Sequence, residues 1–161
     1  MKKFFISIIA VCLMCACGPK NSGPEQPPTK YIEYDLSETL PAGVWKGEGY
    51  SHTSIGEKNH VEIEIQIDRN NIITDTYSGV FHGVAHESFE YVSKGLANVI
   101  HNDEKIGTCR CALSMCDCDL VSDGVTMNRI ITFSKIGIDI VEAGSLGDLT
   151  FEQTYRLYVK K

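Results

Sequence analysis

The sequence has little positive charge and no long hydrophobic run, and these two features argue against nucleic-acid binding and against a membrane-spanning helix. Lys and Arg number 15 against 21 Asp and Glu, the formal net charge is -6 at pH 7, and the basic residues form no cluster. Nucleic-acid affinity rests on neutralising phosphates with Lys and Arg, so we expect no nucleic-acid partner. A membrane-spanning helix needs roughly 20 consecutive apolar residues. The longest apolar run, from Phe4 to Met14, is too short to span a bilayer.

The chain also lacks the motifs that mark common catalytic and metal sites. It has no G-x-S-x-G and no glycine-rich phosphate loop, and "GSLG" at 144–147 has the wrong spacing for a catalytic serine. "HGVAH" places His82 and His86 four residues apart, without the Glu of H-E-x-x-H. Gly83 and the β-rich surroundings favour an extended chain, which would separate the two rings by about 13 Å. We expect no cofactor, and a non-enzymatic role is favoured, although the sequence leaves enzymatic activity open.

Residues 1–16 have the pattern of an export signal. Lys2 and Lys3 precede the apolar run, and the small residue Ala16 stands directly before Cys17. This order resembles a bacterial lipoprotein signal, in which cleavage exposes a cysteine that then receives lipid; the alternative is an ordinary secretory signal. The resemblance implies lipidation of Cys17. In lipoproteins, an Asp after the lipidated cysteine signals retention in the inner membrane, and in some bacteria an acidic cluster there marks export to the cell surface. Here Gly18 follows Cys17 and no acidic cluster is present. We therefore expect the protein to be anchored in an outer membrane and to face the periplasm.

Residues 17–30 form the lipidated cysteine and a tether, and residues 31–161 form one domain. The tether, "GPKNSGPEQPPTK" after Cys17, is rich in Pro, Gly and polar residues and has no hydrophobic period. Such a segment buries too little apolar area to fold. Its thirteen residues, at about 3.1 Å each when extended, reach roughly 40 Å.

Alternation of apolar and polar residues dominates the chain after Pro41. "VEIEIQI" is its purest instance, with four branched residues on one face: Val61, Ile63, Ile65 and Ile67. Such alternation predicts strands with one buried and one wet face, and we count eight or nine short strands. Residues 89–100 also fit helical spacing, so one short helix is an alternative there. Many short strands predict an all-β domain, either a closed antiparallel barrel or a β-sandwich.

Gly43-Val44-Trp45 leads into the first strand, and Arg156 lies in the last. This pair resembles the calycin pattern, in which a Gly-x-Trp packs beneath an Arg or Lys near the end of the last strand. The resemblance implies a small up-and-down barrel like that of lipocalin-like lipoproteins, closed by Trp45 and Arg156, with a small apolar ligand in its cavity.

A weaker resemblance is to flavin-mononucleotide-binding domains of membrane redox systems. Those domains also begin with an aromatic-x-Gly-x-Gly strand, as in "WKGEGY", and with a hairpin like "VEIEIQIDRNNIITD". Their phosphate-binding Ser-Gly-Ala-Thr-x-Thr-Ser has only a broken counterpart in "VSDGVTMN", residues 121–128. The helix expected after this signature is replaced here by a strand pattern. The resemblance implies a flavin-binding redox accessory module.

Four cysteines remain once the signal and Cys17 are set aside: Cys109, Cys111, Cys116 and Cys118. An even number in an exported protein favours disulfides. If "ALSM" at 112–115 is a hairpin loop, Cys111 faces Cys116 and Cys109 faces Cys118, each pair within bridging distance. We therefore predict these two bridges, in a locked turn at the rim of the barrel. The alternatives are a soft-metal site for copper or zinc on the four thiolates, or a redox-active dithiol.

These observations together predict a lipid-anchored cell-envelope protein with a binding or accessory role. Its partners would be the membrane, through the anchor, and a small apolar ligand. The sequence identifies no protein partner. A metal-handling lipoprotein and a flavin-binding module remain as alternatives.

Overall fold

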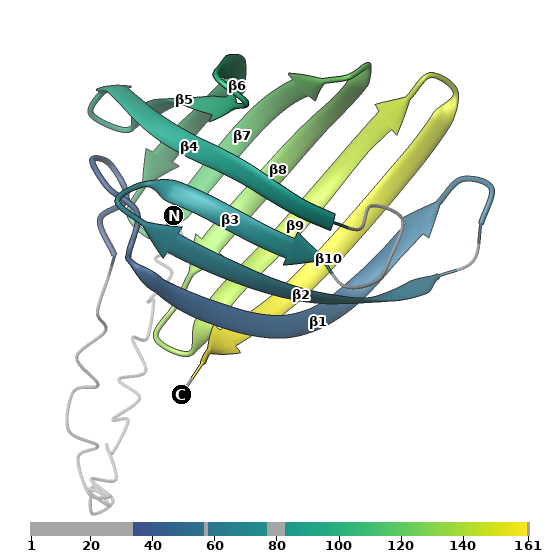
Figure 1. Cartoon of the computed structure of the whole chain (residues 1–161), viewed down its shortest axis with the longest axis horizontal. Helices are drawn as coiled ribbons and strands as arrows, with labels where there is room; N and C mark the ends of the chain where they lie inside the picture. The colour runs from purple at the N-terminus through teal and green to yellow at the C-terminus, as the bar shows by residue number, and fades with distance from the viewer. Residues whose placement is uncertain (1–33, 57, 77–82, 161) are drawn as a thin grey trace, which may run out of the picture. The chain divides into compact units, whose positions relative to one another are not determined.

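Ten antiparallel strands close into one barrel in the computed structural model, which describes residues 34–56, 58–76 and 83–160 (Figure 1). The strands are β1 (Gly43–Thr53), β2 (Asn59–Asp68), β3 (Asn71–Thr76), β4 (Gly83–Ser93), β5 (Leu96–His101), β6 (Glu104–Ala112), β7 (Met115–Ser122), β8 (Val125–Phe133), β9 (Gly137–Leu146) and β10 (Leu149–Val159). The predicted signal, the predicted tether, Cys17 and His82 lie outside the described residues. Among those described, no helix is long and apolar enough to cross a bilayer.

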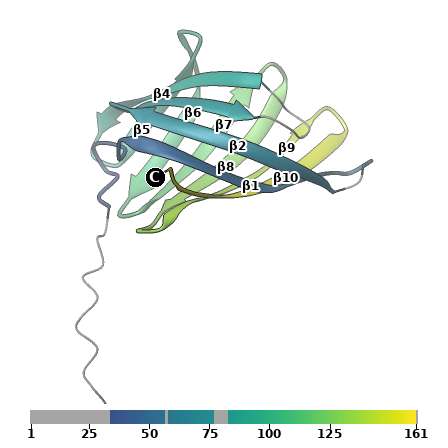
Figure 2. The same ribbon diagram turned by 60° about the horizontal axis from the view of Figure 1, so that its bottom comes forward.

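The barrel has up-and-down connectivity. Each strand pairs with its neighbours in sequence, and β1 pairs with β10 to close the ring. In both ribbon views the first strands, β1 and β2, cross in front of β8 and β9 (Figure 2). The predicted closed antiparallel barrel is therefore confirmed and the sandwich is excluded, but the strand count of eight or nine was too low.

The segment for which a helix was an alternative, residues 89–100, consists of strand throughout except for one turn. It contains the end of β4, a turn at Lys94 and Gly95, and most of β5. Gly95 has a φ of 73°, in the left-handed region that favours glycine, so the residue that argued against a helix forms the turn. No helix occurs among the described residues.

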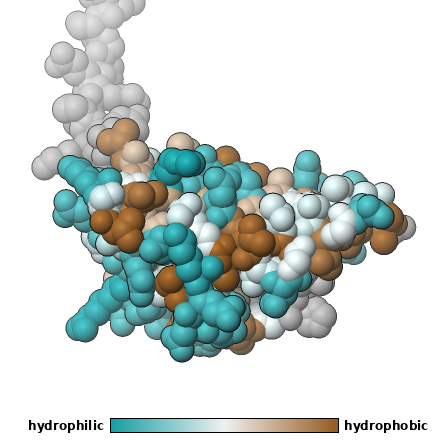
Figure 3. All heavy atoms as spheres, turned by 90° about the horizontal axis from the view of Figure 1, so that it is seen from above, coloured by the Kyte–Doolittle hydropathy of each residue, from teal (hydrophilic) through white to brown (hydrophobic). Residues whose placement is uncertain are grey.

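Alternation along the strands builds the interior. On β2 the four branched residues of "VEIEIQI" are buried in the barrel, and the glutamates between them face outward. The same alternation gives a mixed outer surface, on which large apolar side chains such as Val84, Val121 and Tyr158 are exposed among polar ones. On the face drawn in Figure 3, hydrophobic residues lie in small groups among hydrophilic ones.

One end of the barrel is filled by residues 34–40, which we call the plug. We call this end the plugged end, and it carries the turns between β2 and β3, β4 and β5, β6 and β7, and β8 and β9. Leu36 and Leu40 of the plug are buried. The Leu36 N–H donates to the Leu113 carbonyl, the Gly95 N–H donates to a plug carbonyl, and the Leu40 N–H donates to the Asn70 side chain, at 2.7 to 2.8 Å. Three separate turns therefore hold the plug.

The predicted contact between Trp45 and Arg156 is not formed. Trp45 is 5% exposed and points into the barrel, where its ring meets Phe133 edge-on at 6.1 Å between centroids. The side chain of Arg156 is 65% exposed and binds Asp139 at 2.7 Å on the outer surface. The reason is alternation: Tyr155, next to Arg156 on β10, faces inward, so Arg156 faces solvent. The Trp still packs the plugged end, but without a cation above it.

The glycines of "WKGEGY" allow β1 to close against β10. A Cβ atom on Gly47 would collide with the carbonyl oxygen of Arg156, and one on Gly49 with that of Thr154. Only glycine fits so close to the neighbouring backbone. Their spacing, which resembled a flavin-domain strand, is thus accounted for by barrel closure.

Candidate functional site

The barrel encloses a cavity of about 430 Å³ on the side away from the plug. Most of its walls are apolar, from Ile63, Ile65, Ile72, Ile106, Leu120, Val125, Met127, Ile131, Ile140 and Phe151. It extends to Thr76, Ser122 and Asp123, at the end that carries the turn between β7 and β8. We call this the mouth end. Pockets of this size and composition are typical of small-molecule sites.

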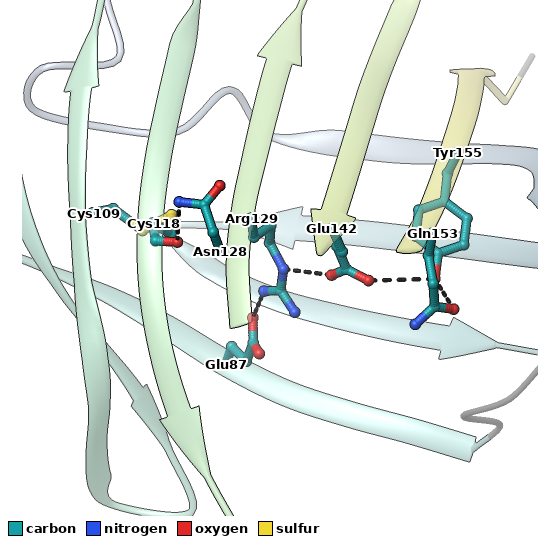
Figure 4. A network of polar contacts seen from close by, with 8 residues as sticks. All are labelled: Glu87, Cys109, Cys118, Asn128, Arg129, Glu142, Gln153 and Tyr155. Atoms are coloured by element: carbon teal, nitrogen blue, oxygen red, sulfur yellow. Dashed lines mark hydrogen bonds and ion pairs between the residues drawn. A yellow bond between two sulfur atoms is a disulfide. The ribbon is translucent and has the colours of Figure 1, made fainter. Parts of the chain in front are cut away.

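A buried row of charged groups crosses the cavity (Figure 4). Arg129 of β8 lies between Glu87 of β4 and Glu142 of β9, and we call these three residues the triad. Arg129 Nη1 is 2.5 Å from Glu87 Oε2, and Arg129 Nε is 2.6 Å from Glu142 Oε1. No side chain of the triad is more than 16% exposed. Because β4 and β8 lie on opposite sides of the ring, the bond between Glu87 and Arg129 spans the interior.

The carboxylates of the triad keep the guanidinium charged. Burial by itself would lower the pKa of Arg129, but the charges and hydrogen bonds of Glu87 and Glu142 outweigh burial and raise this pKa above its usual range. Arg129 is therefore a permanent cation held by two acidic groups. Removing it would leave both carboxylates buried without a counter-charge.

Two residues of β10 extend the row. The Tyr155 hydroxyl donates to Gln153 Oε1 at 2.6 Å and lies 3.3 Å from Glu142 Oε2. Burial, and secondly the charge of Glu142, raise the pKa of Tyr155, so its hydroxyl stays protonated. The row thus places a neutral hydroxyl and an amide beside the charged triad.

The triad was not predicted from the sequence, although alternation contained a signal for two of its members. Arg129 and Glu142 stand at positions that face the interior, between the apolar residues of β8 and β9. A charged residue on an otherwise buried face points to a partner or a ligand. The partner across the barrel, Glu87, needed the closed ring to be known.

Both predicted disulfides are present, Cys109 with Cys118 and Cys111 with Cys116. All four cysteines are buried and face the barrel interior, and none lines the cavity. Only the second bridge adjoins the turn, so the pair is not confined to the rim. Bonded sulfurs offer no thiolate to a metal ion. Within the described ranges, no three His, Cys, Asp or Glu residues are grouped as a metal site.

Two further predicted features can be placed. His86 is exposed on β4, away from the cavity lining, and its predicted partner His82 lies outside the described residues. "VSDGVTMN" forms the hairpin between β7 and β8, and Ser122, Asp123, Val125 and Met127 from it line the cavity.

Comparison with known proteins adds the fold relationship. No protein-family model matches the chain, and no curated protein matches it. Among solved structures the chain is similar to the S-type phycobiliprotein lyase CPES from Guillardia theta, with a TM-score of 0.56 and 9% sequence identity, covering 74% of this chain and 88% of that one. An identity this low shows the fold alone. The chain therefore has a closed, antiparallel, calycin-like β-barrel fold.

Proposed function

We propose that this protein is a lipid-anchored binding protein of the bacterial cell envelope, which holds a small, largely apolar ligand in its barrel. The observation that carries the proposal is the cavity of about 430 Å³, with apolar walls and a few convergent polar groups. Burial of a methylene group contributes about 0.8 kcal/mol, so a ten-carbon chain contributes roughly 8 kcal/mol before the cost of association.

The buried polar groups of the row across the cavity support binding over catalysis. Both carboxylates of the triad are held by Arg129, and the Tyr155 hydroxyl donates to Gln153. A general base needs a carboxylate that is available to take a proton from its substrate. In this arrangement the polar groups position a ligand, and the apolar walls supply most of its affinity.

The anchoring part of the proposal rests on the sequence around Cys17. Replacing Cys17→Ser should abolish the acyl mass on the mature protein and release it from membranes, since two or more acyl chains are needed for stable attachment. Cys15→Ser is the matched control, because that residue lies within the signal and should leave lipidation unchanged. Mass spectrometry of both variants gives the answer, and an acylated Cys17→Ser protein would contradict this part.

Ligand binding can be tested by filling the cavity. Ala85 lines the cavity, whereas its neighbour Val84 on β4 is 60% exposed on the outer face. Titration with the neutral apolar dye N-phenyl-1-naphthylamine should give a fluorescence rise, and Ala85→Trp should weaken dye binding at least tenfold. Val84→Trp adds the same ring outside and should leave affinity within about twofold. Equal binding by both variants would place the dye outside the barrel and contradict the proposal.

The same purified protein tests the two alternatives. A flavin-binding module would be yellow or would quench added flavin, and a metal-handling protein would retain copper or zinc in non-denaturing mass spectrometry. We expect a colourless protein whose intact mass is four hydrogens below the fully reduced value, with no metal. Bound metal or flavin at equal stoichiometry would replace the apolar-ligand proposal.

A further inference from the structure

The charges that line the cavity do not balance. Three carboxylates line it, those of Glu87, Asp123 and Glu142, against one guanidinium, that of Arg129. His101 is the one other residue in the lining that can carry a positive charge, and no lysine occurs among the described lining residues. The cavity therefore has an excess of negative charge.

The excess negative charge includes the buried triad, where an uncompensated charge is most destabilising. The triad is shielded from solvent and carries a net charge of one negative unit, because a single Arg129 serves both Glu87 and Glu142. A buried charge without a counter-charge is destabilising, and attraction between opposite charges is stronger inside a protein than in water. A cation in the adjoining cavity would restore neutrality. A second anion would raise the excess to two units.

The walls beside the triad also suit a cation. Phe151 and Tyr155 of β10 both line the cavity. The faces of aromatic rings attract ammonium groups, and this attraction grows when water is excluded. An apolar body would fill the isoleucine-rich part of the cavity, while its charged end lies at the acidic row.

We propose that the cavity selects amphipathic cations, meaning ligands with an apolar body and one amine or ammonium end held beside the triad. This inference rests on the proposed function, since it names the class of ligand that the same cavity takes. Neutral ligands of equal length gain the contacts with the walls but no charge compensation. Anionic amphiphiles gain the same contacts and meet repulsion from Glu87 and Glu142.

The test compares three ligands that differ only in their head groups: decylamine, decanol and decanoate. Each displaces N-phenyl-1-naphthylamine from the wild-type protein at pH 7, below its micelle-forming concentration. One net charge at close range should make decylamine bind about tenfold more tightly than decanoate, with decanol between them. Glu142→Gln makes the triad neutral and should reduce this ratio to within about threefold. Glu87→Gln should do the same and gives a second, independent variant.

Glu152→Gln is the matched control, because Glu152 lies on the outer face of β10 and loses the same charge without touching the cavity. Its ratio should equal that of the wild type. A wild-type ratio within threefold, a preference for decanoate, or an equal loss of preference in Glu152→Gln would overturn the charge selection while leaving the cavity's binding role intact. A folded wild-type protein that binds neither the dye nor any of the three ligands would instead overturn the proposed function.

Discussion

Replacing Arg129→Met should destabilise the barrel more than any other single substitution in the triad. The Met fills similar volume without a charge, and Glu87 and Glu142 then remain buried with no cation between them. Removing one partner of a buried ion pair typically costs about 3 to 5 kcal/mol. Here two carboxylates lose their partner at once, so we expect the upper part of that range.

The single glutamate substitutions should cost less. In Glu87→Gln or Glu142→Gln the remaining carboxylate still pairs with Arg129, and the triad becomes electrically neutral. Each variant weakens one hydrogen bond to Arg129, a loss of about 1.5 to 3 kcal/mol, and Glu142→Gln also weakens the contact with the Tyr155 hydroxyl. The ranking, with the arginine substitution clearly the most severe, is the signature of one cation serving two anions.

Urea unfolding, followed by tryptophan fluorescence with the disulfides intact, measures these differences. With a slope of roughly 1 to 3 kcal/mol per molar urea, Arg129→Met should lower the midpoint by about 2 M. Arg156→Met is the matched control, since it removes the same charge from an exposed pair on the outer surface and should leave the midpoint nearly unchanged. The triple variant Glu87→Leu, Arg129→Met, Glu142→Leu should recover most of the lost stability. Replacing all members of a buried ion-pair network by apolar residues is often neutral for stability.

Two outcomes would refute this reasoning. If Arg129→Met lowered the midpoint no more than Arg156→Met, the triad would be solvated in solution. If either glutamate variant were less stable than Arg129→Met, the net negative charge would not be the source of the cost.

Three further predictions concern the plugged end. Leu36→Ala should cost about 2 to 5 kcal/mol of unfolding free energy in urea because Leu36 is buried in the plug, whereas the same truncation at exposed Ile136 should be neutral; equal effects would show that the plug is loose. Removing the bridge between Cys111 and Cys116 by double alanine substitution should cost at most about 2 kcal/mol, since the loop is short and the other bridge remains; failure to fold would contradict this. Burial, and secondly the charge of Asp35, raise the pKa of Tyr91 to about 12. The protonated Tyr91 hydroxyl therefore contributes fully to the free energy of unfolding below pH 10, and this contribution is lost as the pH rises to 12. Urea midpoints from pH 9 to 12 should therefore fall less steeply in Tyr91→Phe, and identical slopes would count against the shift.

The fold was predictable because its signal is local. Alternation such as that of "VEIEIQI" needs no knowledge of partners, and the cysteine pairing followed from one hairpin register. The strand count failed where one segment, residues 89–100, fitted two periods. The predicted contact between Trp45 and Arg156 was wrong for a different reason. The family resemblance placed both residues near one end of the barrel, but it did not say which face of its strand each side chain occupies.

The site was hidden because it is not local. Glu87 and Arg129 are 42 residues apart in the chain, and they meet only because the three intervening strands, β5 to β7, carry the chain from β4 to the opposite wall at β8. Alternation alone assigns Arg129 and Glu142 to the inner face, but which side chain each of them meets depends on the curvature of the closed ring. Cavity volume is likewise a property of the whole barrel, set by which inward residues are small.

The plug makes the two ends of the barrel different, because it fills one end and the cavity extends to the other. The chain enters the described domain through the plug, and the last strand finishes at the same end, where the Lys160 N–H donates to the Val44 carbonyl at 2.9 Å. The cavity extends to the opposite end. An affinity tag or a fusion partner joined before residue 34 or after residue 160 would therefore attach at the plugged end, opposite the end to which the cavity extends. Surface immobilisation through either terminus should accordingly preserve binding.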